Sequence, residues 1–474
     1  MKNFSKKFIK ILGLTAAGSL LILTGFGCKG LSLQQQAATK PFVLEYWTVF
    51  DDVEKIQALA SAYTANRKFI TINVRQLRSD EIYNRFVEAL ADDKGPDIIS
   101  VNARSLGKYI DRLQPMPPTI TDTTLVETKN NFSTTVNVFS NPKAMINVIK
   151  LKSEYVQTVY KDAIRKDKVK ENIYGLPLSL DVMGIYYNKD LLDRAGIPEA
   201  PKTWEEFQAD VKILTKFDKA SGKILQAGAA FGTGKNIPAS SDLLYILFAQ
   251  SKIPFVQNNF AVFDSKPQAF SGDELPSTQI MNFYTDFANP LRDTYTWNDS
   301  MPNALDSFVN GQTAFFFGYS YEFPIIKSRA PQLNFSVIPM LQLSEGAAVN
   351  TANYWLQTVT AKSKHSNEAW GFIDFIAHSP AAKQYLELTK RPTALRIYLA
   401  EQKQNPDLAP FVSQVLTAEN WYQGRDFEAA DKAIQTMFTE WLQPVPDDKD
   451  LAKTREEILH RAASKVNQTY IKAK

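Results

Sequence analysis

The residues of this 474-residue chain that could carry covalent or metal chemistry are three histidines, one cysteine and scattered acids. His365, His378 and His460 stand in no HExxH motif or other metal-ligand spacing, and no GxSxG motif supports a serine nucleophile. Cys28 is alone, so a disulfide framework and a thiolate metal site are both excluded. We therefore predict no catalytic residue, no metal site and no cofactor.

Aromatic residues near the ends of expected strands point instead to noncovalent binding of a small molecule. A ring can cover an apolar face of a ligand, while carboxylate, amide and guanidinium groups bond its polar rim. The aromatic candidates share this placement and are Trp47, Tyr319, Tyr321, Tyr354, Trp355, Trp421 and Tyr422. The polar candidates are Asp51, Asn102, Asp181 and Arg391.

The first hundred residues predict the elements that would position the earliest of these side chains. Apolar runs at 42–47, 69–76 and 98–101 predict strands, and residues 51–66 and a segment capped by Ser79 predict helices. Such alternation is typical of a mostly parallel sheet flanked by helices. Ligands bind such sheets at the carboxyl ends of the strands, which selects Trp47 and the turn at 100–102.

Residues 174–207 hold the densest series of local signals. Gly175 and Pro177 predict a turn, residues 182–187 a buried strand, and Asn188 the cap of a helix over 189–195 that Gly196 ends. Thr203 and a glutamate three residues later predict a capping box for the next helix.

The remaining chain gives uneven signals. Residues 115–150 show poor hydrophobic periodicity, so we expect loops and short helices there, followed by a helix over 153–164. Further strands are expected at 313–317, 334–339 and 354–361, and helices at 242–250, 277–288, 302–310, 367–377 and 381–388 and from Asp426 and Asp450.

Several motifs occur in an order that resembles a known family. They are YGLP, YYNKDLL, AGI and PKTWEEF within 174–207, together with GPDII, FVNGQTAFFFGYSYEF and KSKHSNEAWGFIDFI. This set resembles the extracellular solute-binding proteins of the sugar-binding group that serve ABC importers. The resemblance implies an α/β, two-lobed fold of the type II periplasmic-binding class, with each lobe a mostly parallel sheet and the ligand cleft between lobes. The expected lobes are 41–179 plus 343–380 and 180–342 plus 381–474.

The resemblance also implies a function. Lobe closure would capture a mono- or oligosaccharide, and the closed monomer would deliver it to ABC permease subunits in the membrane. Asp181 lies at the expected hinge exit, where similar proteins place an acid that bonds the sugar. Two alternatives stay open: a binding protein for iron, polyamine, peptide or phosphate ester, and an exported carbohydrate-active hydrolase.

The N-terminus has the layout of an export signal. Four lysines precede an apolar run over 11–23, and small residues lead to Cys28. We predict a lipoprotein signal peptide at 1–27, acylation of Cys28 and a tether over 28–40, which would anchor the chain on the outer face of the cytoplasmic membrane. The net charge is +4 and residues 1–27 hold four lysines and no acid, so the rest is formally neutral, which argues against a nucleic-acid partner.

Overall fold

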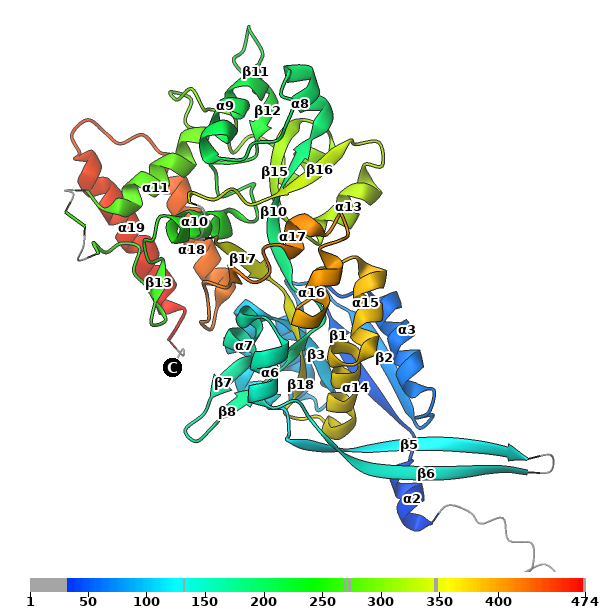
Figure 1. The fold of residues 1–474 in the computed structure, drawn as a ribbon. Helices are drawn as coiled ribbons and strands as arrows, with labels where there is room; N and C mark the ends of the chain where they lie inside the picture. Colours follow the sequence, from blue (N-terminus) through cyan, green and yellow to red (C-terminus); the bar gives the residue numbers. More distant parts are fainter. Residues whose placement is uncertain (1–31, 131–132, 268–269, 272–273, 345–347, 472–474) are drawn as a thin grey trace, which may run out of the picture.

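The computed structural model describes residues 32–130, 133–267, 270–271, 274–344 and 348–471, and it places them in two lobes (Figure 1). Each lobe is built around one mixed sheet with helices packed on it. The predicted signal peptide, Cys28 and the first residues of the tether lie outside the described residues. Within the described ranges, no helix combines the length and the apolar character needed to cross a membrane.

The first lobe contains the strands and helices predicted from the early sequence. Its sheet has the order β2-β1-β3-β18-β4, with β9 also paired to β18, and the predicted parallel alternation of β2, β1 and β3 is confirmed. Its strands are β1 (Phe42–Thr48), β2 (Ile70–Gln76), β3 (Ile98–Asn102), β4 (Leu113–Gln114), β9 (Leu176–Pro177) and β18 (Trp355–Thr360). Its helices are α3 (Val53–Thr64), α4 (Ile82–Ala91), α5 (Leu106–Tyr109), α14 (Ser366–His378) and α15 (Pro380–Thr389).

The second lobe is organised by the long buried strand β10 (Asp181–Asn188). Its sheet has the order β11-β12-β15-β10-β17-β19, and β16 pairs with β10. The other strands are β11 (Lys216–Phe217), β12 (Ile224–Ala229), β15 (Thr313–Tyr319), β16 (Phe335–Pro339), β17 (Asn350–Asn353) and β19 (Ala418–Glu419). The helices are α8 (Lys189–Ala195), α9 (Trp204–Leu214), α10 (Ser240–Gln250), α11 (Pro276–Thr285), α12 (Ala304–Val309), α13 (Glu322–Arg329), α17 (Ala409–Val412), α18 (Phe427–Trp441) and α19 (Leu451–Gln468).

Helix caps account for most of the predicted boundaries. Asn188 accepts a hydrogen bond from the N–H of Leu191, and Gly196 ends α8 with φ of 75°. Thr203 accepts from the N–H of Glu206, but the Glu206 carboxylate bonds the N–H of Lys202, so the capping box is not reciprocal. The predicted cap at Ser79 is wrong, because α4 begins three residues later without a side-chain cap.

The chain passes between the lobes three times. The first two crossings join β9 to β10 and β17 to β18, with Tyr354 between the latter two strands. The third runs from α15 through α16 (Arg396–Gln402) to α17. Two elements lie in a different lobe from the one expected. β17 falls within 343–380, expected in the first lobe, but pairs with the second sheet. Most of α15 falls within 381–474, expected in the second lobe, but α15 packs on α3 of the first. Strand and helix patterns cannot show which of two sheets an element near a hinge joins.

Within residues 115–150, two long strands form a projecting β-hairpin, which corrects the expectation of loops and short helices. β5 (Thr119–Asn130) and β6 (Ser133–Ala144) pair in continuous antiparallel register and extend away from the first lobe (Figure 1). Arg67 fixes its base by an ion pair of 2.7 Å with Asp122. Much of the hairpin is solvent-exposed, so it lacks the apolar alternation of a half-buried strand.

Two shorter segments also differ from expectation. The single helix predicted over 153–164 is two helices, α6 (Val148–Glu154) and α7 (Gln157–Ala163), because Tyr155 and Val156 are extended. The hairpin of β7 (Ile164–Lys166) and β8 (Glu171–Ile173) follows. The expected tether contains a short helix, α2 (Leu33–Ala38), which Ser32 and Gln35 cap reciprocally.

Candidate functional site

A cavity of about 280 Å³ lies between the lobes and is lined by aromatic rings, acids and amides. The first lobe contributes Ser79, Asn102, Arg104, Ser105 and Trp355, and the second Pro238, Ala239, Asp242, Phe316, Phe317, Tyr319, Tyr321, Glu322, Asn353, Phe427, Glu428 and Asp431. The mixture of flat apolar faces with a few convergent polar groups is typical of a small-molecule site.

Arg104 crosses from one lobe to the other at the edge of this cavity. It follows β3 of the first lobe, yet among the described residues the hydrogen-bond acceptors of its guanidinium group all belong to the second lobe. Its guanidinium donates to Asp242 Oδ2 at 2.9 Å, to the Tyr319 hydroxyl at 2.9 Å and to the Ala352 carbonyl at 2.6 Å. Phe427 covers the guanidinium face, with 5.0 Å between the Arg104 Cζ and the ring centroid.

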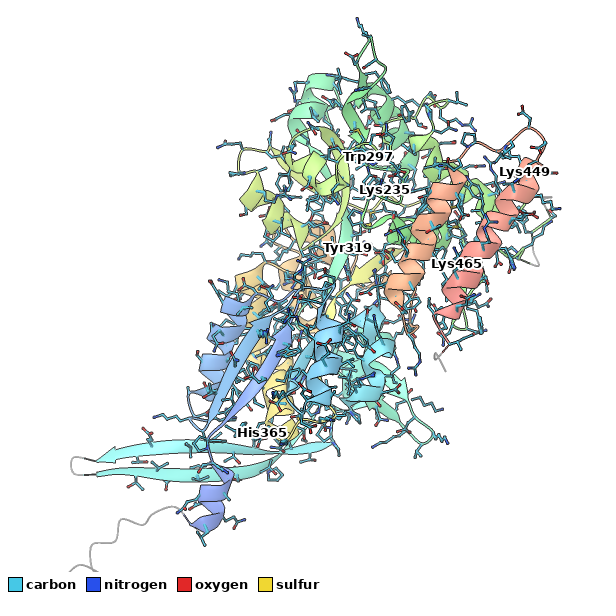
Figure 2. The ribbon with its side chains drawn as sticks, turned by 180° about the vertical axis from the view of Figure 1, so that it is seen from behind. Lys235, Trp297, Tyr319, His365, Lys449 and Lys465 are labelled. Carbon is cyan, nitrogen blue, oxygen red and sulfur yellow. The ribbon has the colours of Figure 1, made fainter. Side chains whose placement is uncertain are left out.

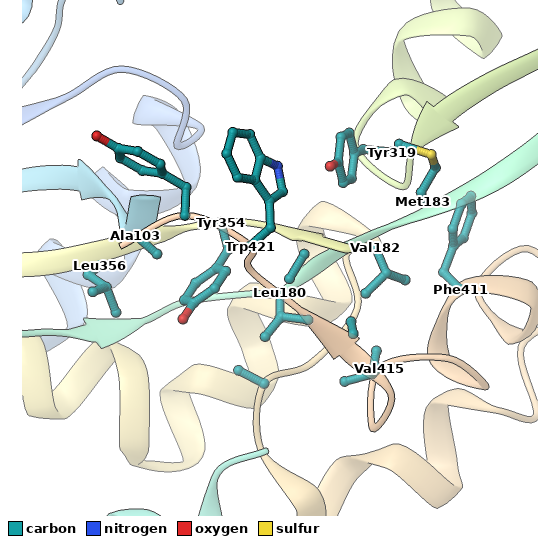
Figure 3. Close-up of a cluster of buried hydrophobic side chains, with 14 of the residues drawn as sticks. Ala103, Leu180, Val182, Met183, Tyr319, Tyr354, Leu356, Phe411, Val415 and Trp421 are labelled. Atoms are coloured by element: carbon teal, nitrogen blue, oxygen red, sulfur yellow. The ribbon is translucent and has the colours of Figure 1, made fainter. Parts of the chain in front are cut away.

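Asp242 is the acceptor on which this network converges. Besides Arg104, it accepts from the Tyr319 hydroxyl at 2.6 Å and from the Trp421 indole at 2.9 Å. Burial alone would lower the pKa of Arg104, but the Asp242 carboxylate and Tyr319 outweigh burial, so the pKa is raised and the guanidinium stays charged. Figure 3 shows Trp421 and Tyr319 above apolar residues of the hinge, including Leu180 and Val182.

Stacked rings form the wall on the other side of the cavity. Trp355 lies parallel to Phe50, with centroids 4.4 Å apart and an interplanar angle of 6°. Tyr321 of the second lobe meets Phe50 edge-on at 4.6 Å and stacks near Tyr319 at 5.8 Å. The packing holds Trp355 in place as a cavity-lining platform.

Two cavity acids lack a cation within ion-pair distance among the described residues. Burial raises the pKa of Glu322 to about 8, although the Tyr319 N–H donates to its carboxylate at 2.7 Å. Burial raises the pKa of Asp431 to about 6, and Ser241 donates to it. A carboxyl that holds its proton near neutral pH can both donate and accept a hydrogen bond.

Four predicted ligand residues line the cavity: Asn102, Tyr319, Tyr321 and Trp355. The side-chain nitrogen of Asn102 donates to Asn353 Oδ1 at 2.8 Å, across the second crossing. The side-chain oxygen of Asn102 accepts a hydrogen bond from the backbone N–H of Arg104. The other seven predicted residues lie outside the cavity lining. They are Trp47, Asp51, Asp181, Tyr354, Arg391, Trp421 and Tyr422.

These seven side chains have partners within the protein. The buried Tyr422 hydroxyl donates to Thr469 Oγ1 at 2.7 Å. Asp51 is 3% exposed and accepts from Thr48 at 2.8 Å and Ser100 at 3.0 Å, while the Tyr354 hydroxyl donates to Asp162 at 2.8 Å. The remaining contacts are the Asp181–Arg391 ion pair at 2.5 Å, Arg75 over the Trp47 ring at 5.6 Å and Trp421 on Asp242.

Sequence reasoning missed several cavity residues, chiefly Arg104, Asp242, Phe427, Glu322 and Asp431. Arg104 could have been predicted, because it stands three residues beyond the end of the strand expected at 98–101. Asp242 and Phe427 lie at the starts of predicted helices. The local sequence at a helix start does not show whether its side chains line a cavity between two lobes.

The histidines lie away from this cavity. His365 stacks on Phe42 at 3.8 Å, His378 contacts Glu154 and Asp374, and the exposed His460 bonds Asp264 at 2.8 Å. Across the described residues, no group of three or more histidines or acids could hold a metal ion.

Comparison with known proteins gives a consistent result. The family model for bacterial extracellular solute-binding proteins matches residues 58–410. The multiple sugar-binding protein of Streptococcus mutans is 23% identical over 270 residues, which cover 56% of this chain and 61% of that relative. The match therefore spans less than two thirds of that relative's length.

Solved structures resemble this fold over nearly their whole length. A sugar-binding protein from Xanthomonas citri has a TM-score of 0.65 at 16% identity, covering 90% of this chain and 98% of that chain. A cyclo/maltodextrin-binding protein complexed with maltotetraose has a TM-score of 0.63 at 16% identity, covering 92% and 99%. The predicted two-lobed fold is confirmed, and the chain belongs to the family of bacterial extracellular solute-binding proteins.

Proposed function

We propose that this protein binds a neutral carbohydrate in the cavity between its lobes and delivers it to the permease of an ABC importer. The observation that carries the proposal is the composition of the cavity, which is lined by Trp355, stacked on Phe50, together with amides, acids and Arg104. Aromatic faces suit the C–H surface of a sugar ring, and the polar groups suit its hydroxyls. The names of the relatives and neighbours, several of which bind sugars, support the same class.

Binding would act by closure of the lobes rather than by chemistry. A ligand that contacts both lobes is bound better by the closed form and shifts the population toward it. Arg104 already makes hydrogen bonds from the first lobe to the second, so the ligand would add further contacts between the lobes. The lipid anchor on Cys28, the permease partners and the monomeric state are parts of the same proposal.

A cationic solute such as a polyamine is the second candidate, because four acids line the cavity against one arginine. Two of them are already paired: Asp242 with Arg104, and Glu428 with Lys108 at 3.5 Å. The pKa of Glu322, raised to about 8, favours its neutral form near neutral pH, and a neutral carboxyl suits a hydroxyl better than an ammonium group.

The test is calorimetric titration of the protein with maltotetraose, mannobiose, tagatose, spermidine and ferric citrate. We expect a sugar to bind, spermidine and iron not to bind, and the sugar to be recovered unchanged. Trp355→Ala should weaken sugar binding by about 2 kcal/mol, roughly 30-fold. Phe217→Ala is the matched control, because Phe217 stacks on Tyr295 at 5.9 Å outside the cavity. Binding of spermidine alone, or turnover of the sugar, would refute the carbohydrate proposal.

A further inference from the structure

A second groove, of about 790 Å³, runs between the first lobe and helices α18 and α19. The first lobe contributes Tyr83, Lys108, Asp111 and Arg112. The second lobe contributes Arg425, Asp426, Ala429, Lys432, Ala433, Thr436, Lys465, Gln468, Thr469 and Ile471. The groove therefore draws its walls from both lobes, as the sugar cavity does.

Helix α18 separates the groove from the sugar cavity. Phe427, Glu428 and Asp431 line the cavity. Ala429, Lys432, Ala433 and Thr436 line the groove and follow the i, i+3, i+4, i+7 spacing of one helix face. The two alanines are small, which leaves room along this face. One helix thus presents acids to the cavity and a cation to the groove.

The groove carries an excess of positive charge. Its five cations are Lys108, Arg112, Arg425, Lys432 and Lys465, against two acids. Asp111 pairs with Arg425 at 3.2 Å, and Asp426 caps α18 by accepting from the Ala429 N–H. Arg112, Lys432 and Lys465 have no carboxylate within ion-pair distance in the described part of the chain. Arg112 and Lys108 lie over the Tyr83 ring, at 6.0 Å and 4.5 Å from its centroid.

We propose that this groove is a second binding site, for an anionic oligosaccharide that carries carboxylate groups. Arg425 and Lys108 are paired with Asp111 and Glu428. Arg112, Lys432 and Lys465, unpaired among the described residues, favour a ligand with several negative charges, and arginine can bind a carboxylate through two hydrogen bonds. Thr436 and Gln468 add hydroxyl and amide groups for sugar hydroxyls. The first-lobe cations Lys108 and Arg112 face second-lobe cations, so the ligand would also bridge the lobes.

The proposal is tested on the mature protein by calorimetric titration with trigalacturonate and with inorganic tripolyphosphate, at 20 and 150 mM salt. We expect trigalacturonate to bind and to weaken at the higher salt, because ions screen exposed charges. The variant Lys432→Glu/Lys465→Glu should weaken this binding at least tenfold.

The matched control is Lys449→Glu/Lys453→Glu, which makes the same change of charge beside the other end of α19. Figure 2 shows Lys449 and Lys465 far apart along this helix. The control should keep trigalacturonate affinity within about threefold of the unmodified protein. Equal losses in both double variants, no binding of trigalacturonate, or binding of tripolyphosphate alone would each overturn the proposal. Failure of a neutral sugar to bind would refute the proposed function and leave the groove unaffected.

Discussion

Two buried arginine–aspartate pairs connect the lobes, and they have different surroundings. Arg391 and Asp181 are 2.5 Å apart, and Arg104 and Asp242 are 2.9 Å apart; all four side chains are at most 8% exposed. The first pair joins the third crossing to the start of β10, beneath the Phe50 ring, which lies 4.3 Å from the Arg391 Cζ. The second pair lines the cavity.

The difference shows that residue type and burial do not identify a binding residue. Asp181 was predicted as a ligand contact because similar proteins place a sugar-bonding acid at the hinge exit, and Arg391 as a polar partner in the turn at 391–393. Ser320 and Arg391 both donate hydrogen bonds to the Asp181 carboxylate. Neither Asp181 nor Arg391 lines the cavity. The Arg104–Asp242 pair has the same chemistry but adjoins open space, so a ligand can reach it.

The largest expected effect is on stability, from breaking the hinge pair. Asp181→Asn leaves Arg391 charged and buried, and removing one partner of such a pair costs about 3–5 kcal/mol of unfolding free energy. Urea denaturation measures this loss. The double variant Asp181→Leu/Arg391→Met should recover much of it, since no charge is then left unpaired. If Asp181→Asn kept the stability of the unmodified protein but bound sugar tenfold more weakly, Asp181 would be a binding residue rather than a structural one.

The second effect is on sugar binding, from the cavity pair. Asp242→Asn weakens the contact that holds Arg104 at the cavity, and we expect about 1.5–3 kcal/mol less binding free energy, roughly 10- to 150-fold in affinity. Arg104 keeps Tyr319 and Ala352 as acceptors, so stability should fall less than in Asp181→Asn. Sugar titration of both variants gives the loss of binding free energy, and urea denaturation gives the loss of unfolding free energy. Unchanged sugar affinity would show that the pair is structural.

The third effect concerns an acid of the cavity without a cationic partner. Glu322 keeps its proton up to about pH 8 in the folded protein, against about 4.5 for the ordinary side chain. Between these values the native state binds more protons than the unfolded state, so the free energy of unfolding falls as pH rises, by at most about 1.4 kcal/mol per pH unit. Stability from this group is complete below pH 4.5 and lost by pH 8. Glu322→Gln should flatten the dependence of Tm on pH between 5 and 8; an unaltered slope would contradict the assignment.

The smallest effect comes from an exposed pair, which serves as the reference for both buried ones. Lys202 and Glu199 are 2.5 Å apart, with side chains 72% and 69% exposed. Water and salt screen such pairs, so Lys202→Ala should leave the midpoint of urea denaturation close to that of the unmodified protein. A shift as large as that of Asp181→Asn would show that ion-pair distance, rather than burial, sets the energetic order.

The elements were largely predictable because they depend on local rules. Asn188 and Gly196 bound α8 through hydrogen bonds and a left-handed φ that neighbouring residues determine. The hairpin β5–β6 was missed because an exposed ribbon has no buried face to produce a periodic pattern. At the site, Trp355 and Tyr319 were found because they lie at a strand terminus, Trp355 at the start of β18 and Tyr319 at the end of β15. Arg104 and Asp242 depend on a contact between residues 138 positions apart.

The sequence by itself determined the family, the α/β character of both lobes and the expectation of binding rather than catalysis, because motifs, periodicity and residue inventory are properties of short segments. Only the tertiary structure decided which polar groups face open space. Asp51, Asp181 and Arg391 are as polar as Arg104 and Asp242, but they are paired with partners away from the cavity. Access to solvent depends on how distant segments pack against one another, and no local pattern records it.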